Sequence, residues 1–404
     1  MASRGLTPAI VMVAGEYPPT LGGIGDYTRI LARELCAAGD DIRLFVPDGS
    51  KVGGGDAAIA GTFPKWSWRT LPYLLDVLAE TDASVVHVQH NASMYRSHCA
   101  SYYFPRYLRG KGWPGRVAVT FHDINLPSLL PRGGRLWAGM ARHWVLGDLA
   151  RQADVSIAAD SVDVESLASL GGRVAQVPIG SNMHGGDGNP ADGSHVRARY
   201  GVPPGNTLVG HFGTPLGLDV VMESLATLSD VTLLLIGKQQ EMHNRSNIEK
   251  LTPRVHDSIA RYRVGDRLRW TGHLPRQDVV NAMAGCDMVV LPYPAGASMR
   301  HGGLVAALTQ GKAVITTSPQ AKMLGLENGV THMEVPTGDA AALGAAIHRL
   351  ASDLDWRHHL EAGAVKAAAD YYSWSAIVAR HREIYRGDQG LSMNLAAAAA
   401  GVRA

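Results

Sequence analysis

The chain has 404 residues, a net charge of +2 and 46% hydrophobic residues, a composition that suits a globular protein of two domains. So small a net charge gives no bulk affinity for nucleic acid or for a membrane surface. The three cysteines, Cys36, Cys99 and Cys286, lie far apart and match no zinc or Cys-X-X-Cys spacing. This indicates reduced thiols in a cytoplasmic protein. The apolar run at 9–14 is too short for a signal peptide, and no segment is long enough to predict a membrane-spanning helix.

Short apolar runs in the first half of the chain predict the buried strands of a parallel sheet. These runs are 9–13, 42–46, 85–88, 117–121, 155–158 and 174–178. After the first strand, a glycine-rich loop at 15–26 leads into a helix predicted over 27–38. This opening is Rossmann-like, but the glycines lack the GxGxxG spacing of a dinucleotide site. Glycines before a helix can still form an anion-binding loop.

Polar side chains follow several of these predicted strands. Asn91 follows the strand at 85–88, and His122 and Asp123 follow the strand at 117–121. Parallel strands end at a common edge of their sheet, and open α/β sheets bind ligands there. A lone histidine is more often structural, but a histidine beside other polar strand ends favours a functional site.

The second half of the chain repeats the α/β pattern. Strands are predicted at 208–212, 231–236, 268–271, 288–291 and 313–316, with helices near 219–228, 278–284, 340–351 and 374–385. Residues 183–205 are rich in Gly, Asp, Asn and Pro and are predicted to be a linker. We therefore expect one domain over 1–182, a second over 206–372, and a poorly ordered tail over 388–404.

The segment 287–317 is predicted to form a strand, a loop, a helix and a second strand. Gly302 and Gly303 open the helix and remove β-carbons that would keep a ligand from the backbone. Helix N–H groups and the helix dipole suit a phosphate, and Arg300 and His301 add donors and charge. The alternative is an ordinary βαβ unit with a solvated arginine.

A basic region at 96–151 carries Trp113, Trp137 and Trp144. One interpretation is an acceptor surface for an acidic or amphipathic molecule, such as a lipid headgroup. The other, which the pattern favours, is a solvated helical face with core tryptophans.

Several motifs acquire meaning from their order and spacing. They are Glu16-Tyr17-Pro18-Pro19, Gly22-Gly23-Ile24-Gly25, Thr120-Phe121-His122-Asp123, Val177-Pro178-Ile179-Gly180, Gly210-His211-Phe212-Gly213, Thr271-Gly272-His273-Leu274-Pro275 and Tyr372-Ser373-Trp374. With the segment 287–317, they make the chain resemble family 4 of the GT-B glycosyltransferases, a large retaining family, over nearly all of 10–386. The resemblance implies two Rossmann-like domains facing each other across a cleft. It also implies a helix at 373–387 that returns to the first domain.

The resemblance implies roles for individual residues as well. It places the nucleotide in the second domain and the acceptor in the first, and it makes His122, near the donor sugar, the expected catalytic residue. The expected donor-binding residues are Gly23, Ile24, Gly25, Gly213, Thr214, Lys238, His273, Leu274, Arg300, His301, Gly302, Gly303 and Leu304. The expected acceptor-binding residues are Glu16, Tyr27, Asn91 and Asp123.

The chain departs from the family pattern at two places. Ser298 and Ala306 stand where the family usually has glutamates that contact the donor sugar and the ribose. The loop 213–217 lacks the usual Arg and Lys that contact the diphosphate, and the nearby bases are Lys238 and Arg300.

The predicted activity is retaining transfer of a sugar from a nucleotide-sugar donor to an acceptor hydroxyl. The leaving diphosphate can take the acceptor proton, so the protein must position the substrates and stabilise charge. No Asp-X-Asp motif ends a predicted strand, so we expect neither a metal nor another cofactor. We expect no nucleic-acid partner and no membrane span, while peripheral membrane association stays open.

Three alternative kinds of protein also stay open: a GT-B nucleotide-sugar epimerase, a pseudo-glycosyltransferase that forms a non-glycosidic bond, and a non-catalytic nucleotide-binding homologue. The sequence names neither the base, the sugar nor the acceptor.

Overall fold

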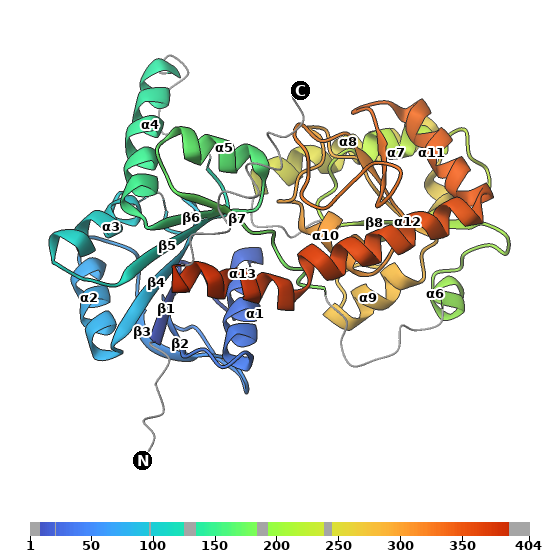
Figure 1. Cartoon of the computed structure of the whole chain (residues 1–404). Helices are drawn as coiled ribbons and strands as arrows, with labels where there is room; N and C mark the ends of the chain where they lie inside the picture. The colour runs from blue at the N-terminus through green and yellow to red at the C-terminus, as the bar shows by residue number, and fades with distance from the viewer. Residues whose placement is uncertain are drawn as a thin grey trace, which may run out of the picture. The chain divides into compact units, whose positions relative to one another are not determined.

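The computed structural model describes residues 9–20, 22–96, 98–124, 135–183, 193–237 and 245–387. The chain divides into two compact units (Figure 1). Unit 1 comprises Met1–Pro178 and Trp374–Ala404, and unit 2 comprises Ile179–Ser373. Each unit is described by itself below.

Unit 1 is built on a parallel sheet of seven strands in the order β3-β2-β1-β4-β5-β6-β7. The strands are β1 (Ala9–Ala14), β2 (Ile42–Pro47), β3 (Ala58–Phe63), β4 (Ala83–His90), β5 (Arg116–Phe121), β6 (Val155–Ala158) and β7 (Val174–Gln176). The helices are α1 (Gly23–Ala37), α2 (Thr70–Glu80), α3 (Ala100–Gly110), α4 (Arg135–Gln152), α5 (Ser161–Ser169) and α13 (Trp374–Arg386). β1 is buried at every position, as expected of a parallel strand covered on both faces. The order of strands reverses between β1 and β4, which makes their carboxyl ends the switch point of the sheet.

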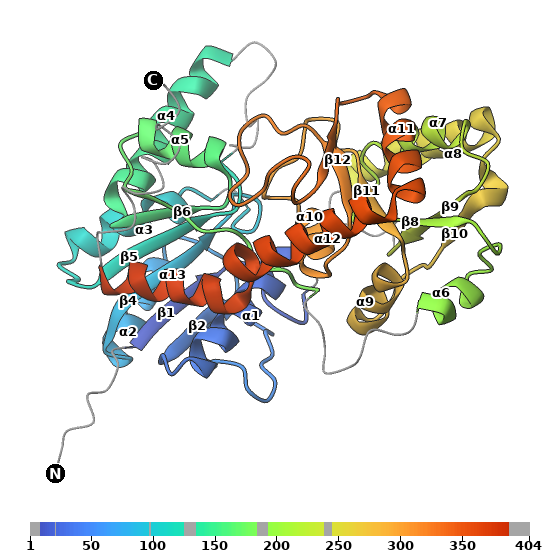
Figure 2. The same cartoon turned by 45° about the vertical axis from the view of Figure 1, so that its right-hand side comes forward.

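Unit 2 has a parallel sheet of six strands in the order β10-β9-β8-β11-β12-β13 (Figure 2). The strands are β8 (Thr207–Phe212), β9 (Val231–Ile236), β10 (Leu268–Trp270), β11 (Met288–Leu291), β12 (Val314–Thr317) and β13 (Met333–Val335). The α-helices are α6 (Gly193–Arg199), α7 (Leu218–Leu225), α8 (Arg245–Tyr262), α9 (Arg276–Ala284), α10 (Gly302–Thr309), α11 (Ala340–Ser352) and α12 (Leu354–Ala367). A 3-10 helix η1 (Gly265–Arg267) and a π-helix η2 (Ala368–Tyr372) complete the unit. Its switch point lies between β8 and β11.

These two parallel α/β units confirm the predicted Rossmann-like class. Two local predictions were wrong. Helix α1 begins at Gly23, one turn earlier than predicted, so residues 23–26 are helical rather than loop. The predicted linker 183–205 contains α6, and Val196 on this helix is buried against Gly285. The predicted tail 388–404 lies outside the described residues.

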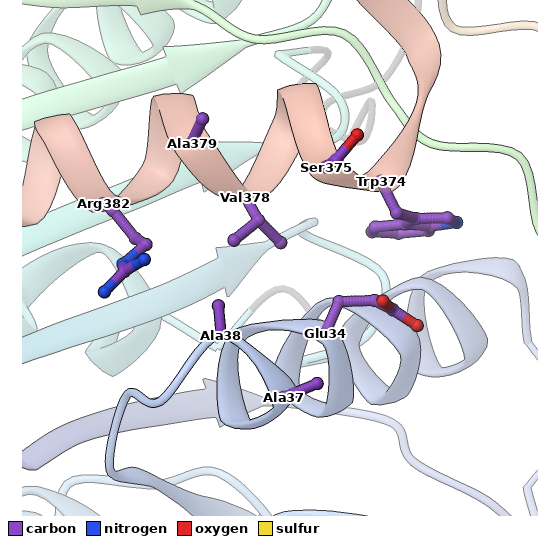
Figure 3. A pocket seen from close by; sticks show the side chains of 8 residues that line it. All are labelled: Glu34, Ala37, Ala38, Trp374, Ser375, Val378, Ala379 and Arg382. Atoms are coloured by element: carbon purple, nitrogen blue, oxygen red, sulfur yellow. The ribbon is translucent and has the colours of Figure 1, made fainter. Parts of the chain in front are cut away.

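Helix α13 closes unit 1 by packing along α1 (Figure 3). Trp374, Val378 and Arg382 project from α13 toward α1, and they line a groove of about 350 Å³ with Ala38 and other α1 residues. Arg382 Nε lies 3.2 Å from a carboxylate oxygen of Asp40, a residue just after α1 that is largely buried. This ion pair adds a contact between α13 and the segment just after α1.

Candidate functional site

In unit 1, the predicted catalytic residue His122 follows β5 and lies beside the carboxyl end of β4. Its backbone N–H donates to the His90 carbonyl at 2.9 Å, which continues the pairing of the two strands by one residue. The half-buried ring places Nε2 2.7 Å from Oε1 of Gln89. Burial lowers the pKa of His122 to about 4. The ring is therefore neutral at pH 7 and can exchange hydrogen bonds without carrying charge.

The start of α1 already holds an anion, the carboxylate of Glu16. Ile24 and Gly25 donate their backbone N–H groups to Glu16 Oε1 at 3.2 and 3.0 Å. A β-carbon at Gly22 would lie 2.2 Å from the same oxygen, so a larger residue there would displace the Glu16 carboxylate from this position. Gly23 differs, because a β-carbon at that position would have no described atom within 4 Å. Of the predicted donor-binding glycines in this turn, Gly23 has room for an added β-carbon, while the N–H of Gly25 is occupied by the protein itself.

The other predicted acceptor-binding residues surround His122 in different ways. Tyr27 is buried and packs edge-on against the His122 ring, with centroids 5.4 Å apart. Asn91 Oδ1 accepts hydrogen bonds from the N–H and the hydroxyl of Ser93, which forms a turn after β4. Asp123 is half-buried. Tyr27 therefore supports His122, and Asn91 shapes the loop beside it.

In unit 2, the loop after β8 carries the predicted residues Gly213 and Thr214. Gly213 has a φ of +103°, a conformation that favours glycine. The buried His211 ring places Nδ1 2.9 Å from the Val290 carbonyl of β11 and Nε2 3.3 Å from the Thr214 carbonyl. His211 thus ties the loop after β8 to the neighbouring strand at the switch point.

The loop after β11 carries Arg300 and His301. Arg300 is exposed, with its backbone N 3.2 Å and its Nε 3.4 Å from the Ser298 hydroxyl. The ring of His301 stacks on Tyr293 at 3.6 Å between centroids, and its Nδ1 accepts from the Ser298 N–H at 3.1 Å. The loop is therefore held by stacking and by hydrogen bonds around Ser298, with the guanidinium side chain at the surface.

Helix α10 begins at the same edge of the sheet. A β-carbon at Gly303 would lie 2.8 Å from the Phe212 carbonyl of β8, whereas one at Gly302 would have no described atom within 4 Å. Leu304 is fully buried, and its N–H donates to the His301 carbonyl at 2.9 Å. Of these three predicted residues, Gly303 and Leu304 pack the helix against the sheet, and Gly302 is exposed at the helix start.

The segment after β10 places His273 at the surface and leaves Leu274 half-buried against the unit 2 core. Nearby, Gly237 after β9 donates its N–H to the Thr271 hydroxyl at 3.0 Å. Lys238, the other predicted donor-binding base, lies outside the described residues. The structure thus brings the loops after β8 and β11 and the start of α10 to one switch point in unit 2. It gathers His122, Tyr27 and the start of α1 in unit 1.

The expected site residues did not include His87, Gln89 and Tyr385, although Gln89 belongs to the polar segment Gln89-His90-Asn91 that follows the strand predicted at 85–88. His87 Nδ1 lies 2.7 Å from the Tyr385 hydroxyl of α13, and Gln89 bonds to His122. A signal was present in β4, where His87 and Gln89 stand at alternate positions among valines and so share one face of the strand. Tyr385 gave no local signal, because it is distant from His87 in the sequence.

Two further observations concern metals and membranes. Among the residues that the structure describes, no group of three His, Cys, Asp or Glu side chains is placed to share a metal ion. Within the same ranges, no helix has the length and apolarity needed to cross a membrane.

Comparison with known families matches both units. Residues 204–353 match the family described as glycosyl transferases group 1, and residues 22–180 match the glycosyl transferase 4-like domain. Together these matches cover more than half of the chain.

Two curated relatives are named phosphatidyl-myo-inositol mannosyltransferase. The protein of Mycobacterium leprae is 24% identical over 280 residues, which cover 67% of each chain. The protein of Mycolicibacterium smegmatis is 22% identical over 400 residues, covering 93% of this chain and 92% of the relative.

Solved structures share the fold at lower identity. Sucrose-phosphate synthase from Thermosynechococcus elongatus has a TM-score of 0.69 at 18% identity, covering 94% of this chain and 98% of that one. Anabaena HepE, in complex with UDP and glucose, has a TM-score of 0.69 at 18% identity, covering 94% and 100%. These similarities support the GT-B arrangement of two α/β domains.

Proposed function

The chain belongs to the glycosyl transferases group 1 family, and on that premise we propose that it transfers a sugar from a nucleotide-sugar donor to an acceptor hydroxyl, with retention of anomeric configuration and without a metal. We assign the donor nucleotide to unit 2, and we assign the acceptor and the catalytic residue His122 to unit 1. A UDP-sugar is the first donor to test, because Anabaena HepE was solved with UDP and with UDP-glucose.

The observation that carries the donor assignment is the switch point of unit 2. Gly303 packs α10 so closely on β8 that the exposed start of the helix lies beside the loop of Gly213 and Thr214. Helix N–H groups and the helix dipole stabilise an anion there. Arg300 supplies a guanidinium on the adjoining loop. A diphosphate is the anion that fits backbone donors combined with a planar cation.

The neutral state of His122 limits what this residue contributes. With a pKa of about 4, the ring carries no charge at pH 7, so it orients a substrate by hydrogen bonding. Stabilisation of the departing diphosphate then falls to Arg300 and to the start of α10. The leaving oxygen takes the acceptor proton on the same face of the sugar, which retains the anomeric configuration.

Metal independence is supported by the sequence around the strand ends. No Asp-X-Asp motif follows a strand, and Asp40-Asp41 precedes β2 instead. A guanidinium and helix N–H groups can neutralise a diphosphate in place of a divalent cation.

The test is incubation of the full chain with a panel of UDP-, GDP-, ADP- and TDP-sugars, glucose and mannose donors included, each with and without hydroxyl-bearing acceptors and with and without EDTA. We expect one donor to release its nucleoside diphosphate, equally with and without EDTA, and His122→Ala to abolish most of the release. Release that EDTA abolishes would overturn the metal-independent mechanism. No release from any donor, although a nucleoside diphosphate raises the unfolding temperature, would favour a non-catalytic homologue.

The same incubation separates the remaining alternatives. An epimerase would release a free sugar product without any acceptor, and a pseudo-glycosyltransferase would give a product whose new bond is not glycosidic. Mass analysis of the products distinguishes both from a glycoside. Ala306, which stands where the family usually has a glutamate, is buried within α10.

A further inference from the structure

A chain of buried polar side chains runs from His122 to helix α13. Gln89 Oε1 lies 2.7 Å from His122 Nε2, and Gln89 Nε2 lies 3.3 Å from His87 Nε2. His87 Nδ1 lies 2.7 Å from the hydroxyl of Tyr385 on α13. The Thr120 hydroxyl on β5 also lies 2.7 Å from His87 Nε2. The chain therefore starts at the proposed catalytic histidine and ends on a helix from the far end of the sequence.

Burying apolar residues at these positions would cost less free energy than burying these polar side chains. His87 and Gln89 are fully buried, and their neighbours in β4, Val86 and Val88, are apolar core residues. A buried polar group costs free energy unless it is hydrogen-bonded. A purely structural group of polar side chains would hydrogen-bond only among its own buried members. This group instead includes His122, which is only half-buried.

The donor and acceptor atoms of the Gln89 amide determine which ring nitrogen of each histidine carries the proton. Burial, together with the neighbouring rings of His381 and His122, lowers the pKa of His87 well below its usual value, so its ring carries one proton. The Gln89 amide nitrogen can only donate, and the Thr120 hydroxyl can also donate to the same ring nitrogen, so with both donating His87 Nε2 accepts and the proton sits on Nδ1. His87 Nδ1–H then donates to the Tyr385 oxygen. At the other end, Gln89 Oε1 can only accept, so His122 Nε2 carries its proton.

We propose that Gln89, His87 and Tyr385 are positioning residues that hold His122 in its Nε2–H tautomer, leaving Nδ1 to accept a hydrogen bond from a hydroxyl group of the bound substrate. The value of this tautomer for turnover rests on the proposed function, but the tautomer itself is a property of the free protein.

Helix α13 also reaches the His122 ring indirectly, through the packing of aromatic side chains. Trp374 at the start of α13 lies against Tyr27 at 5.5 Å between centroids, and Tyr27 packs edge-on against His122 at 5.4 Å. The Arg382–Asp40 ion pair holds α13 on α1, as Figure 3 shows for the Arg382 side. Helix α13 therefore sets both the orientation of the His122 ring and, through Tyr385, the position of its proton.

The experiment is ¹⁵N NMR of histidine-labelled protein, in which long-range ¹H–¹⁵N correlations distinguish the two tautomers. The His122 signals are assigned by their loss in His122→Asn. We expect Nε2–H in the wild type. Tyr385→Phe removes the acceptor for His87 Nδ1–H, so His87 should move its proton to Nε2, Gln89 should reverse its amide, and His122 should shift toward Nδ1–H. Gln89→Met should leave His122 as a mixture of tautomers.

Tyr95→Phe is the matched control. Its hydroxyl is also buried and donates to Gln89 at 2.9 Å, but to the backbone carbonyl, so the tautomer of His122 should not change. An Nδ1–H tautomer in the wild type would overturn the proposal, as would a tautomer that stays the same in Tyr385→Phe. If Gln89→Met fails to fold, Tyr385→Phe still decides.

Turnover measurements on the same variants separate this proposal from the proposed function. We call the hydrogen-bonded chain from Gln89 through His87 to Tyr385 the relay. Loss of the relay should lower kcat by about 10-fold with a smaller change in KM, by analogy with residues that orient a functional histidine. If the tautomer shifts as expected but His122→Ala keeps full activity, the relay stands and the catalytic role of His122 is wrong. If the tautomer does not respond but His122→Ala is inactive, the relay alone is wrong.

Discussion

The two units present chemically different groups at the switch points of their sheets. In unit 1, the groups near the switch point are side chains, with His122, Gln89 and Tyr27 packed at the ends of β4 and β5 and the start of α1. In unit 2, the groups are backbone, with Gly213 after β8 and Gly302 at the start of α10, and the charge comes from an exposed arginine. One unit positions a neutral ring, while the other exposes N–H groups and a cation.

This difference fits two tasks in one reaction. A diphosphate is bound well by N–H groups and guanidinium, which need little burial. A histidine held in one defined tautomer needs fixed hydrogen-bond partners, because contact with water allows its two tautomers to exchange. The comparison predicts that unit 1 is sensitive to acid and to loss of single side chains, and that unit 2 is sensitive to changes in backbone geometry.

The largest expected effect is acid destabilisation of unit 1. Burial lowers the pKa of His90 to about 3 and that of His381 to about 4, while an unfolded histidine titrates near 6.5. Below pH 6.5 the unfolded chain binds protons that the folded unit does not bind. The free energy of unfolding is therefore highest above pH 6.5 and decreases as the pH falls to about 4. Each such histidine accounts for roughly 3 kcal/mol over this range. In unit 2, burial also lowers the pKa of His211 and of His332, but the Val290 and Thr214 carbonyls oppose this shift in His211 and Glu334 opposes it in His332.

Hydrogen exchange at pH 7.5, 6 and 5, corrected for the intrinsic pH dependence, checks this prediction. We expect β4 and β5 to lose protection before β8 and β11. His381→Leu is the informative variant, because Nε2 of His381 has no hydrogen-bond partner within the described ranges. It should fold at pH 7.5 and reduce the acid sensitivity of unit 1. Equal loss of protection in both units would contradict the comparison.

Next in size is the effect of His122→Ala on turnover. Removal of one preorganised hydrogen-bonding group at a reaction centre typically lowers kcat by about 100-fold or more. The variant should still fold, with a somewhat lower unfolding temperature, because loss of the half-buried ring leaves the buried Gln89 Oε1 without its hydrogen-bond partner. His98→Ala serves as the control, since His98 belongs to unit 1 but its ring contacts Trp68 rather than Tyr27 or Gln89. Full activity in a folded His122→Ala variant would make His122 a structural residue.

A third prediction concerns Arg300 and the missing bases of the loop 213–217. A charge-assisted contact to a phosphate is worth roughly 1.5–3 kcal/mol, so Arg300→Ala should weaken UDP binding by about 10- to 100-fold and barely affect uridine. Arg300→Lys should restore only part, because an ammonium cannot hold two phosphate oxygens at once.

Calorimetric titration with UDP and uridine decides this, with Arg254→Ala as a control for an exposed arginine on α8. If all four proteins bind UDP equally, Arg300 is a solvated loop residue and Lys238 becomes the base to test.

Much of the fold could be predicted from local patterns. The strands at 155–158, 231–236 and 288–291 have the predicted bounds, because each is a short, mostly apolar run that is buried at every position. The strands β3 and β13 lie at sheet edges and were not predicted, since such strands lack that apolar signal. Helix α8 is polar and contains Pro253, which hides its periodicity.

The unpredicted parts of the candidate site depend on residues that are distant in sequence. Helix α1 starts one turn early because the Glu16 carboxylate, eight residues before Ile24, accepts from its first N–H groups. The relay needs Tyr385 to reach His87 across 298 positions of sequence. Strand ends can be predicted from the sequence, but the choice between a bound ligand and the protein's own side chain at each end depends on tertiary contacts.

The smallest expected effect comes from a matched pair of glycines at the start of α10. A methyl group at Gly303 would meet the Phe212 carbonyl at 2.8 Å, so Gly303→Ala should push α10 from β8 and destabilise unit 2 by about 1–3 kcal/mol. A methyl group at Gly302 would meet no described atom, and alanine favours the helix by at most about 1 kcal/mol. Gly302→Ala should therefore keep or slightly raise the unfolding temperature.

If a phosphate approaches this backbone, however, the same methyl group occupies its path, and UDP should bind more weakly without any loss of stability. Thermal unfolding and UDP titration of both variants check the pair. Unchanged UDP affinity in Gly302→Ala would place the diphosphate elsewhere, and unchanged stability in Gly303→Ala would show that the contact with β8 relaxes freely.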